Sequence, residues 1–323
     1  MGTRLLEVQN LKTYFIRPNS VVKAVDGVSF HVDENETLGL VGESGSGKTI
    51  SCLSMLRLVP KPGRIVGGKI LLEGEDLVGV SEKRMQRIRG CKISMILQDP
   101  MTSLNPVFTV GDQIGESIST HSKFKRAELI AKIIEMLKLV RIPAPETRIN
   151  AYPHQMSGGM KQRVVGAISI SCQPRLLIAD EPTTSLDVTI QAQYLELLKD
   201  IQRELGVSLI FITHDFGIVA NMCDRVAVMY AGQIVESAPV RDIFYRPAHH
   251  YTASLLKAVP KLEIKVDRLV SIPGQPPRLN HLPAGCRFAP RCSRADDKCV
   301  RDEPPLLAMD ENHSVKCWYH CNQ

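Results

Sequence analysis

Eight consecutive residues combine glycines, a lysine and a hydroxyl at a spacing suited to phosphate: Gly42-Glu43-Ser44-Gly45-Ser46-Gly47-Lys48-Thr49. An apolar run, Thr37 to Val41, precedes them and a helix-compatible segment follows, so the order is strand, loop, helix. Glycines let successive backbone NH groups turn toward phosphate oxygens, and the helix N-terminus adds its positive end. Lys48 can neutralise β- and γ-phosphates while the Thr49 hydroxyl holds Mg²⁺. The motif predicts a nucleoside triphosphate site.

A second apolar strand, predicted over residues 175–181, ends in two carboxylates. Asp180 and Glu181 end this run, and His214 directly follows another predicted strand, Ser208 to Thr213. At the carboxyl edge of a parallel sheet, an Asp near a phosphate loop holds Mg²⁺ and the next acid polarises an attacking water. The alternative is a solvated turn with two acids.

A second possible anion cradle lies at Ser157-Gly158-Gly159, ahead of a helix predicted over residues 161–171. Ser157 is suited to cap that helix, whose N-terminal NH groups could bind phosphate. If the cradle faced outward, it would need a second subunit's nucleotide. An ordinary helix cap explains the segment equally well.

Strand-like runs alternate with turns over residues 5–41, and a helical pattern begins near residue 110. Strands are predicted over residues 5–11, 21–25, 28–32, 69–73, 92–97, 226–230 and 233–236, and a helix over 188–205. Between residues 110 and 149, apolar residues recur at helical spacing, which indicates an amphipathic helical insert. The pair Tyr14-Phe15 ends the first run, and by composition alone it packs in the sheet.

Composition describes an ordinary globular protein of about two domains, with 323 residues, 23% charged and 44% apolar. A net charge of +6 without a basic block argues against a nucleic-acid partner. No apolar run could span a bilayer, Met1 to Leu6 lacks a signal-peptide core, and Leu6 does not fit a myristoylation motif. We therefore expect a cytoplasmic protein with reduced thiols.

Nine cysteines fall into two groups. Cys52, Cys91, Cys172 and Cys223 are scattered and are interpreted as small core residues. The other five lie in a proline-rich stretch after Pro260, with the spacing C-x5-C-x6-C-x17-C-x3-C. That spacing lacks the CxxC pair usual in zinc ribbons, so zinc, an iron-sulfur cluster and free thiols all remain open.

Taken in order, these motifs resemble the nucleotide-binding subunit of an ATP-binding cassette (ABC) transporter. The resemblance implies that residues 42–49 form the Walker A loop, with Gly42, Ser44, Gly45, Gly47, Lys48 and Thr49 on ATP. It implies that Asp180 and Thr49 bind Mg²⁺ together with the Q-loop residue Gln98. By the same resemblance, Glu181 corresponds to the catalytic glutamate, His214 to the switch histidine, and Asp187 to a residue of the D-loop. Phe15 aligns best with the aromatic that stacks on adenine, although Tyr14 is adjacent.

Ser157, Gly158 and Gly159 match the signature motif, which closes on the γ-phosphate held by a second subunit. Here it is Met156-Ser157-Gly158-Gly159-Met160 and departs from Leu-Ser-Gly-Gly-Gln at both ends. The resemblance implies a head-to-tail dimer with ATP sandwiched between one subunit's phosphate loop and the other's signature motif. One chain carries a single copy of each motif, so a partner ATPase is required.

Two stretches, residues 99–106 and 246–252, narrow the resemblance to the peptide/nickel importer branch and its D-type peptide ATPases. That branch pairs two different ATPases with two membrane permease subunits and an extracytoplasmic substrate-binding protein. It implies an ATPase at the cytoplasmic face of the membrane that drives di- or oligopeptide uptake. Nickel, glutathione or another small solute is an alternative cargo, and a soluble ABC ATPase in DNA repair or translation is the alternative of another class.

The same resemblance favours a [4Fe-4S] cluster on Cys286, Cys292, Cys299 and Cys317, and leaves Cys321 spare. The fold expected is α/β: a P-loop ABC-ATPase core with a mixed sheet and an antiparallel β subdomain. A helical subdomain over about residues 100–172 is inserted in the nucleotide-binding domain, residues 1–259. Residues 260–323 form a small, irregular, Cys-rich extension.

Overall fold

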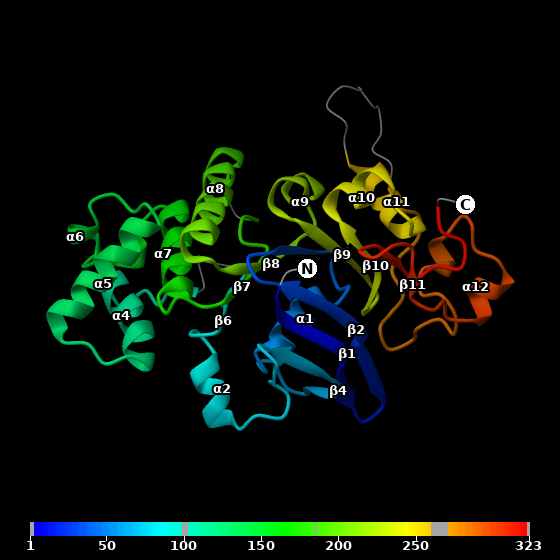
Figure 1. Ribbon diagram of the computed structural model, residues 1–323, viewed down its shortest axis with the longest axis horizontal. Coiled ribbons are helices and arrows are strands. Elements are labelled where there is room, and N and C mark those ends of the chain that lie inside the picture. The colour runs from blue at the N-terminus through cyan, green and yellow to red at the C-terminus, as the bar shows by residue number, and fades with distance from the viewer. Residues whose placement is uncertain (1–2, 99–102, 185, 260–270, 322–323) are drawn as a thin grey trace. The chain divides into compact units, whose positions relative to one another are not determined.

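The computed structural model describes residues 3–98, 103–184, 186–259 and 271–321 (Figure 1). Parts of three predicted features lie outside these ranges: residues 99–102 after Gln98, Ser185 before Asp187, and residues 260–270 of the extension. Within the described ranges the chain forms two compact units. The helical unit comprises residues 3–5, 32–36 and 79–211, and the phosphate-loop unit comprises residues 6–31, 37–78 and 212–321.

Three neighbouring strands lie wholly or mostly in the helical unit. They are β6 (Ile93–Ile96), β7 (Leu176–Asp180) and β8 (Ser208–Thr213), in the order β8-β7-β6. β6 and β7 run parallel, and Ile96 pairs with Ala179. Every residue of β7 and β8 is buried, as continuous apolar runs predict for strands covered on both faces. The strands expected from sequence at these positions are confirmed.

Helices make up the rest of this unit, and Figure 1 shows α4, α5, α6 and α7 grouped together. The bounds are α2 (Glu82–Ile88), α4 (Val110–His121), α5 (Arg126–Leu139), α6 (Pro145–Arg148), η1 (Pro153–Gln155), α7 (Gly158–Ile170) and α8 (Val188–Leu205). Thr109 and Asp112 form a reciprocal capping box at the start of α4. On α5 the buried side is Ile133, Met136 and Leu137. The predicted amphipathic helical insert is therefore confirmed.

An antiparallel sheet opens the phosphate-loop unit. It contains β1 (Arg4–Arg17), β2 (Ser20–Asp33), β4 (Gly63–Leu72) and β5 (Glu75–Asp76), in the order β2-β1-β4-β5. The separate strands predicted over residues 21–25 and 28–32 are wrong, because one continuous strand covers both. Gly27 lies between them with φ 83°, a conformation that lets a strand continue through an irregularity.

Five further strands of this unit lie in the order β11-β12-β10-β9-β3. They are β3 (Thr37–Val41), β9 (Arg225–Tyr230), β10 (Gln233–Pro239), β11 (Leu307–Ala308) and β12 (Ser314–Val315). β3 is parallel to β9, whereas β9, β10, β12 and β11 pair antiparallel, so the mixed sheet is confirmed. The helices are α1 (Lys48–Met55), α9 (Phe216–Met222), α10 (Val240–Tyr245), α11 (His250–Ala258), η2 (Ala289–Arg291) and α12 (Asp297–Arg301).

The extension is more ordered than its proline content predicts. β12 adds to the edge of β10, where Val315 pairs with Glu236, and β11 adds to β12. An edge strand offers unpaired backbone groups, so a short segment from far along the chain can complete it. Among the described residues, no helix is both long and apolar enough to cross a membrane.

Candidate nucleotide site

The phosphate loop follows the fully buried strand β3 and leads into α1, as its motif predicts. Gly42 and Gly47 have φ values of 156° and 107°. A Cβ on Gly42 would lie 2.1 Å from the Met229 carbonyl oxygen, and one on Gly47 would lie 2.3 Å from the Ala24 carbonyl oxygen. Only glycine fits at these two positions, because both the dihedral angle and the neighbouring backbone exclude a side chain.

Lys48 is 5% exposed and its ammonium lies over the loop itself. Its Nζ donates to the carbonyl oxygens of Gly42 (2.7 Å) and Glu43 (3.0 Å). Ser44 and Gly45 are exposed at the tip of the loop, and nothing lies within 4 Å of where a Gly45 Cβ would be. Thr49 lies in the first turn of α1. Open space at the tip, a fixed positive charge and a helix N-terminus suit a phosphate group.

The C-terminal extension holds one side chain of this loop in place. Arg291 donates to both carboxylate oxygens of Glu43, from Nη1 at 2.8 Å and from Nη2 at 3.0 Å. The Tyr251 hydroxyl accepts a hydrogen bond from the Glu43 backbone NH at 2.9 Å. Burial alone would lower the pKa of Arg291, but the hydrogen bonds to Glu43 and Tyr230 outweigh it and raise that pKa. No local pattern in the sequence predicts this contact, because the two residues are 248 positions apart.

At the carboxyl end of β7, two acids occupy different environments. Asp180 is 2% exposed, whereas Glu181 is partly exposed and has φ 44°, an unusual backbone conformation for a non-glycine residue. The Glu181 carboxylate accepts a hydrogen bond from Gln98 Nε2 at 3.0 Å. The structure thus brings together Gln98 and Glu181, which are 83 residues apart in sequence. A carboxylate held by an amide, next to a buried aspartate, is suited to orient water beside a metal ion.

Ser157 caps α7, as its sequence context predicts. Its side-chain oxygen accepts a hydrogen bond from the Met160 backbone NH at 3.3 Å. Ser157, Gly158 and Gly159 line a cavity of about 640 Å³ together with Asp187, which caps α8 through the Ile190 backbone NH. These four residues therefore share one cavity of the helical unit.

His214 and Phe15 belong to the phosphate-loop unit. His214 is exposed directly after β8. Phe15 is partly exposed on β1, where it pairs with Gly63 of β4. The hydroxyl of the adjacent Tyr14 donates a hydrogen bond to the Asp26 carboxylate at 2.5 Å. Burial and this hydrogen bond raise the pKa of Tyr14 to about 12.

Four thiols of the extension lie around one cavity. Cys286, Cys292, Cys299 and Cys317 line it, and burial raises the pKa of each thiol. Cys321 is not among the lining residues, and its sulfur lies 3.3 Å from His250 Nδ1. The structure thus brings together the four cysteines singled out by the resemblance and leaves the fifth outside.

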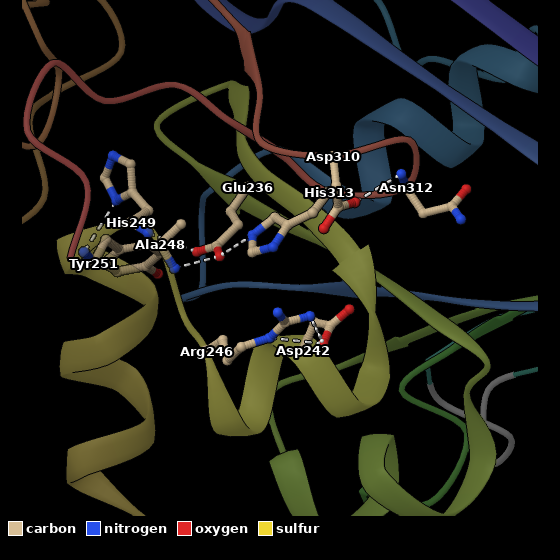
Figure 2. A network of polar contacts seen from close by, with 9 residues as sticks. All are labelled: Glu236, Asp242, Arg246, Ala248, His249, Tyr251, Asp310, Asn312 and His313. Atoms are coloured by element: carbon tan, nitrogen blue, oxygen red, sulfur yellow. Dashed lines mark hydrogen bonds and ion pairs between the residues drawn. The ribbon is translucent and has the colours of Figure 1, made fainter. Parts of the chain in front are cut away.

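A buried carboxylate anchors the extension beside that cavity (Figure 2). Glu236, with no exposed surface, accepts hydrogen bonds from the backbone NH groups of Ala248 (2.6 Å) and His249 (2.9 Å) and lies 2.8 Å from His313 Nε2. His249 also lines the cavity, and its Nδ1 accepts from the Tyr251 backbone NH at 3.0 Å. One carboxylate therefore joins β10, the start of α11 and the extension.

The combination of the phosphate loop, the buried Asp180 and the helix α7 capped by Ser157 is typical of an ATP-binding cassette ATPase. Comparison with known proteins agrees with this class. The ABC transporter family model matches residues 25–184, and the model for the oligopeptide/dipeptide transporter C-terminal region matches residues 235–299. The chain belongs to the family of ABC transporter ATP-binding proteins, in its oligopeptide/dipeptide group.

Relatives extend the match over nearly the whole chain. The oligopeptide transport ATP-binding protein OppD of Bacillus subtilis is 52% identical over 318 residues, which cover 98% of this chain and 89% of that protein. The dipeptide transport ATP-binding protein DppD of the same organism is 49% identical, covering 98% and 94%.

Solved structures agree on the fold. The cassette MJ0796 bound to ADP and Pi superimposes with a TM-score of 0.65 at 23% identity, covering 73% of this chain and 99% of that one. CbiO1 from Clostridium perfringens gives 0.64 at 25% identity, covering 76% and 92%.

Proposed function

We propose that this chain is the ATP-hydrolysing subunit of a membrane importer for di- and oligopeptides. The observation that carries the proposal is the 52% identity to an oligopeptide transport ATP-binding protein over 98% of the chain, which includes the extension. The chain is then peripheral to the cytoplasmic face of the membrane. It works with a second ATPase chain, two permease subunits and a substrate-binding protein outside the cell.

Within the phosphate-loop unit, backbone NH groups of residues 42–49 bind the phosphates of ATP. Lys48 exchanges its contacts with the loop carbonyls for the β- and γ-phosphates, and Thr49 contributes its hydroxyl to Mg²⁺. Phe15 is the proposed adenine platform, because the Tyr14 hydroxyl is already bound to Asp26. The open tip at Gly45 leaves room for the phosphate group.

Hydrolysis depends on Glu181. Asp180 and Gln98 would bind Mg²⁺, and His214 would contact the γ-phosphate and keep it in position. Glu181 orients a water molecule for in-line attack, and its hydrogen bond from Gln98 keeps the carboxylate in place. Because Gln98 lies two residues beyond the end of β6, a shift of that segment caused by the permease would reach Glu181 through this bond. Mg²⁺ supplies the charge that neutralises the phosphates as they separate.

Each subunit completes its partner's site. Ser157, Gly158 and Gly159 face an open cavity with Asp187, so the helix terminus is accessible to the γ-phosphate on another chain. Binding of ATP closes the head-to-tail dimer and hydrolysis reopens it. A groove of about 560 Å³ between α4 and α5, lined by residues such as Gly115, Ile130 and Ile134, is the proposed seat of a permease helix.

Transport in cells tests the proposal. Uptake of labelled di- and oligopeptides, with nickel alongside, is compared between wild type, Glu181→Gln and the matched control Glu196→Gln on the exposed side of α8. Loss of general-base assistance lowers ATP hydrolysis by about 100-fold or more, so peptide uptake should vanish only in Glu181→Gln. If Glu181→Gln abolishes nickel uptake but leaves peptide uptake intact, the cargo is nickel and not a peptide. Unchanged transport of both would refute the importer assignment.

We further propose that the extension holds a [4Fe-4S] cluster on Cys286, Cys292, Cys299 and Cys317. Four cysteines around one cavity fit this group, which thiolates ligate. All four thiols line the same cavity, so they could ligate one group from several sides.

Iron analysis tests the cluster separately from transport. Protein purified without oxygen should be brown and contain about four iron and four sulfide per chain. Cys292→Ser should lose most of this iron, whereas Cys321→Ser, whose thiol is outside the cavity, should keep it. A folded, colourless, iron-free wild-type protein would refute the cluster.

A further inference from the structure

Three side chains that can ligate a metal ion meet in the helical unit, outside the extension. Cys91 lies in the turn between α2 and β6, His121 is the last residue of α4, and Cys172 lies two residues beyond the end of α7. Their ligand atoms all lie within 4.8 Å of one another, and each residue is partly exposed. The interpretation of Cys91 and Cys172 as scattered core residues is therefore wrong, although Cys52 and Cys223 are buried as expected.

Hydrogen bonds connect the segments that carry His121 and Cys172 before any ligand is present. Ser171 Oγ donates to Ser117 Oγ at 3.0 Å, and the Cys172 thiol donates to the Ser117 carbonyl oxygen at 3.6 Å, so the ends of α4 and α7 are tied together. Gly90 has φ 82°, and a Cβ there would lie 3.0 Å from His121 Nε2. A glycine at this turn therefore lets the imidazole ring approach Cys91.

We propose that Cys91, His121 and Cys172 form a binding site for one zinc ion, with a water molecule as the fourth ligand. Two thiolates and one imidazole are ligands that zinc prefers, and the absence of a carboxylate from the set makes it a poor site for Mg²⁺ or Ca²⁺. The ligand atoms need to draw together by at most about 1 Å to reach tetrahedral zinc distances. That is a side-chain adjustment, since the backbone already places the three residues together.

Zinc at this site would brace two segments that reach the nucleotide machinery. α7 ends at the site, and its other end carries Ser157 at the cap. Cys91 directly precedes the segment that runs through β6 to Gln98. A metal ion that joins the two would fix the end of α7 to the segment that leads through β6 to Gln98, without touching ATP itself.

Zinc binding to the full chain tests the site. Reduced protein is titrated with Zn²⁺ against a chromophoric chelator, for wild type, Cys91→Ser, Cys172→Ser, His121→Gln and the extension variant Cys292→Ser. We expect the three variants in the helical unit to lose one equivalent of zinc or to bind it at least tenfold more weakly. Cys292→Ser should keep this equivalent, which separates the site from the thiols of the extension.

Rescue distinguishes ligation from a structural effect. His121→Cys supplies another zinc ligand and should restore the equivalent lost in His121→Gln, whereas a defect in folding would remain. Addition of zinc should raise the melting temperature of wild type and His121→Cys but not of His121→Gln. Equal zinc stoichiometry and affinity in wild type, Cys91→Ser and Cys172→Ser would overturn the proposal. Recovery of Cys91 and Cys172 as a disulfide whose reduced form binds no zinc would also overturn it.

Discussion

The ion pair between Arg291 and Glu43 links the extension to the phosphate loop, and its removal should weaken both stability and ATP binding. The Arg291 side chain is 4% exposed and makes two charged hydrogen bonds to a carboxylate that is 25% exposed. A hydrogen bond to a charged group contributes about 1.5–3 kcal/mol. Because water can partly solvate the released Glu43, we expect Arg291→Met to destabilise the protein by about 2 kcal/mol, rather than by the sum of two such bonds.

A double-mutant cycle isolates the pair. Urea unfolding of wild type, Arg291→Met, Glu43→Gln and the double variant should give a coupling free energy of about 1–2 kcal/mol. Arg291→Lys keeps the charge but loses the two-pronged contact, so it should fall between wild type and Arg291→Met. Arg301→Met, an exposed arginine of α12, is the matched control and should change stability by less than about 0.5 kcal/mol.

ATP affinity gives a second measure of the same contact. With Arg291 removed, the negative charge of Glu43 in the phosphate loop is no longer neutralised, so the Kd for ATP should rise in Arg291→Met. The rise should be absent when Glu43→Gln is combined with it, because the unpaired charge is then gone. A coupling free energy below about 0.3 kcal/mol together with an unchanged Kd would refute the reasoning.

Three other residues give predictions of independent kinds. Gly42→Ala should abolish ATP binding and lower the unfolding free energy by about 2 kcal/mol or more, measured by nucleotide titration and urea unfolding, because its Cβ would meet the Met229 carbonyl oxygen at 2.1 Å. Burial lowers the pKa of His249 to about 4 from an ordinary value of about 6.5, so the unfolded chain takes up the proton first as the pH falls. Stability should therefore be complete above pH 6.5 and fall by about 3 kcal/mol between pH 6.5 and 4, a loss that a pH series of unfolding free energies should show to be smaller in His249→Gln. Ser157→Ala removes the hydrogen bond from the Met160 backbone NH and should lower the unfolding free energy by about 1 kcal/mol. The same variant should reduce ATP-dependent dimerisation, measured by gel filtration. Unchanged dimerisation would show that the Ser157 hydroxyl does not make the proposed contact.

Local signals were sufficient for much of the architecture. The phosphate loop, the helix α8 (Val188–Leu205) and the strand β8 (Ser208–Thr213) agree with their predicted positions, because glycine spacing, caps and apolar runs act within a few residues. Family resemblance, carried by the order of these motifs, predicted the ABC transporter class that the comparisons show.

Contacts between distant segments were decided only by the tertiary structure. Three such contacts are not predicted by any pattern of neighbouring residues. They are the ion pair of Arg291 with Glu43, the pairing of β12 with the edge of β10, and the cluster of Cys91, His121 and Cys172. Even the continuity of β2 through Gly27 depends on its pairing with a neighbouring strand. Sequence alone determined the chemistry this chain can offer to ATP, since that chemistry lies in one short loop and a few strand ends. Which distant side chains support that loop depended on packing, because a contact between remote residues is selected by the whole folded surface and not by neighbours in the chain.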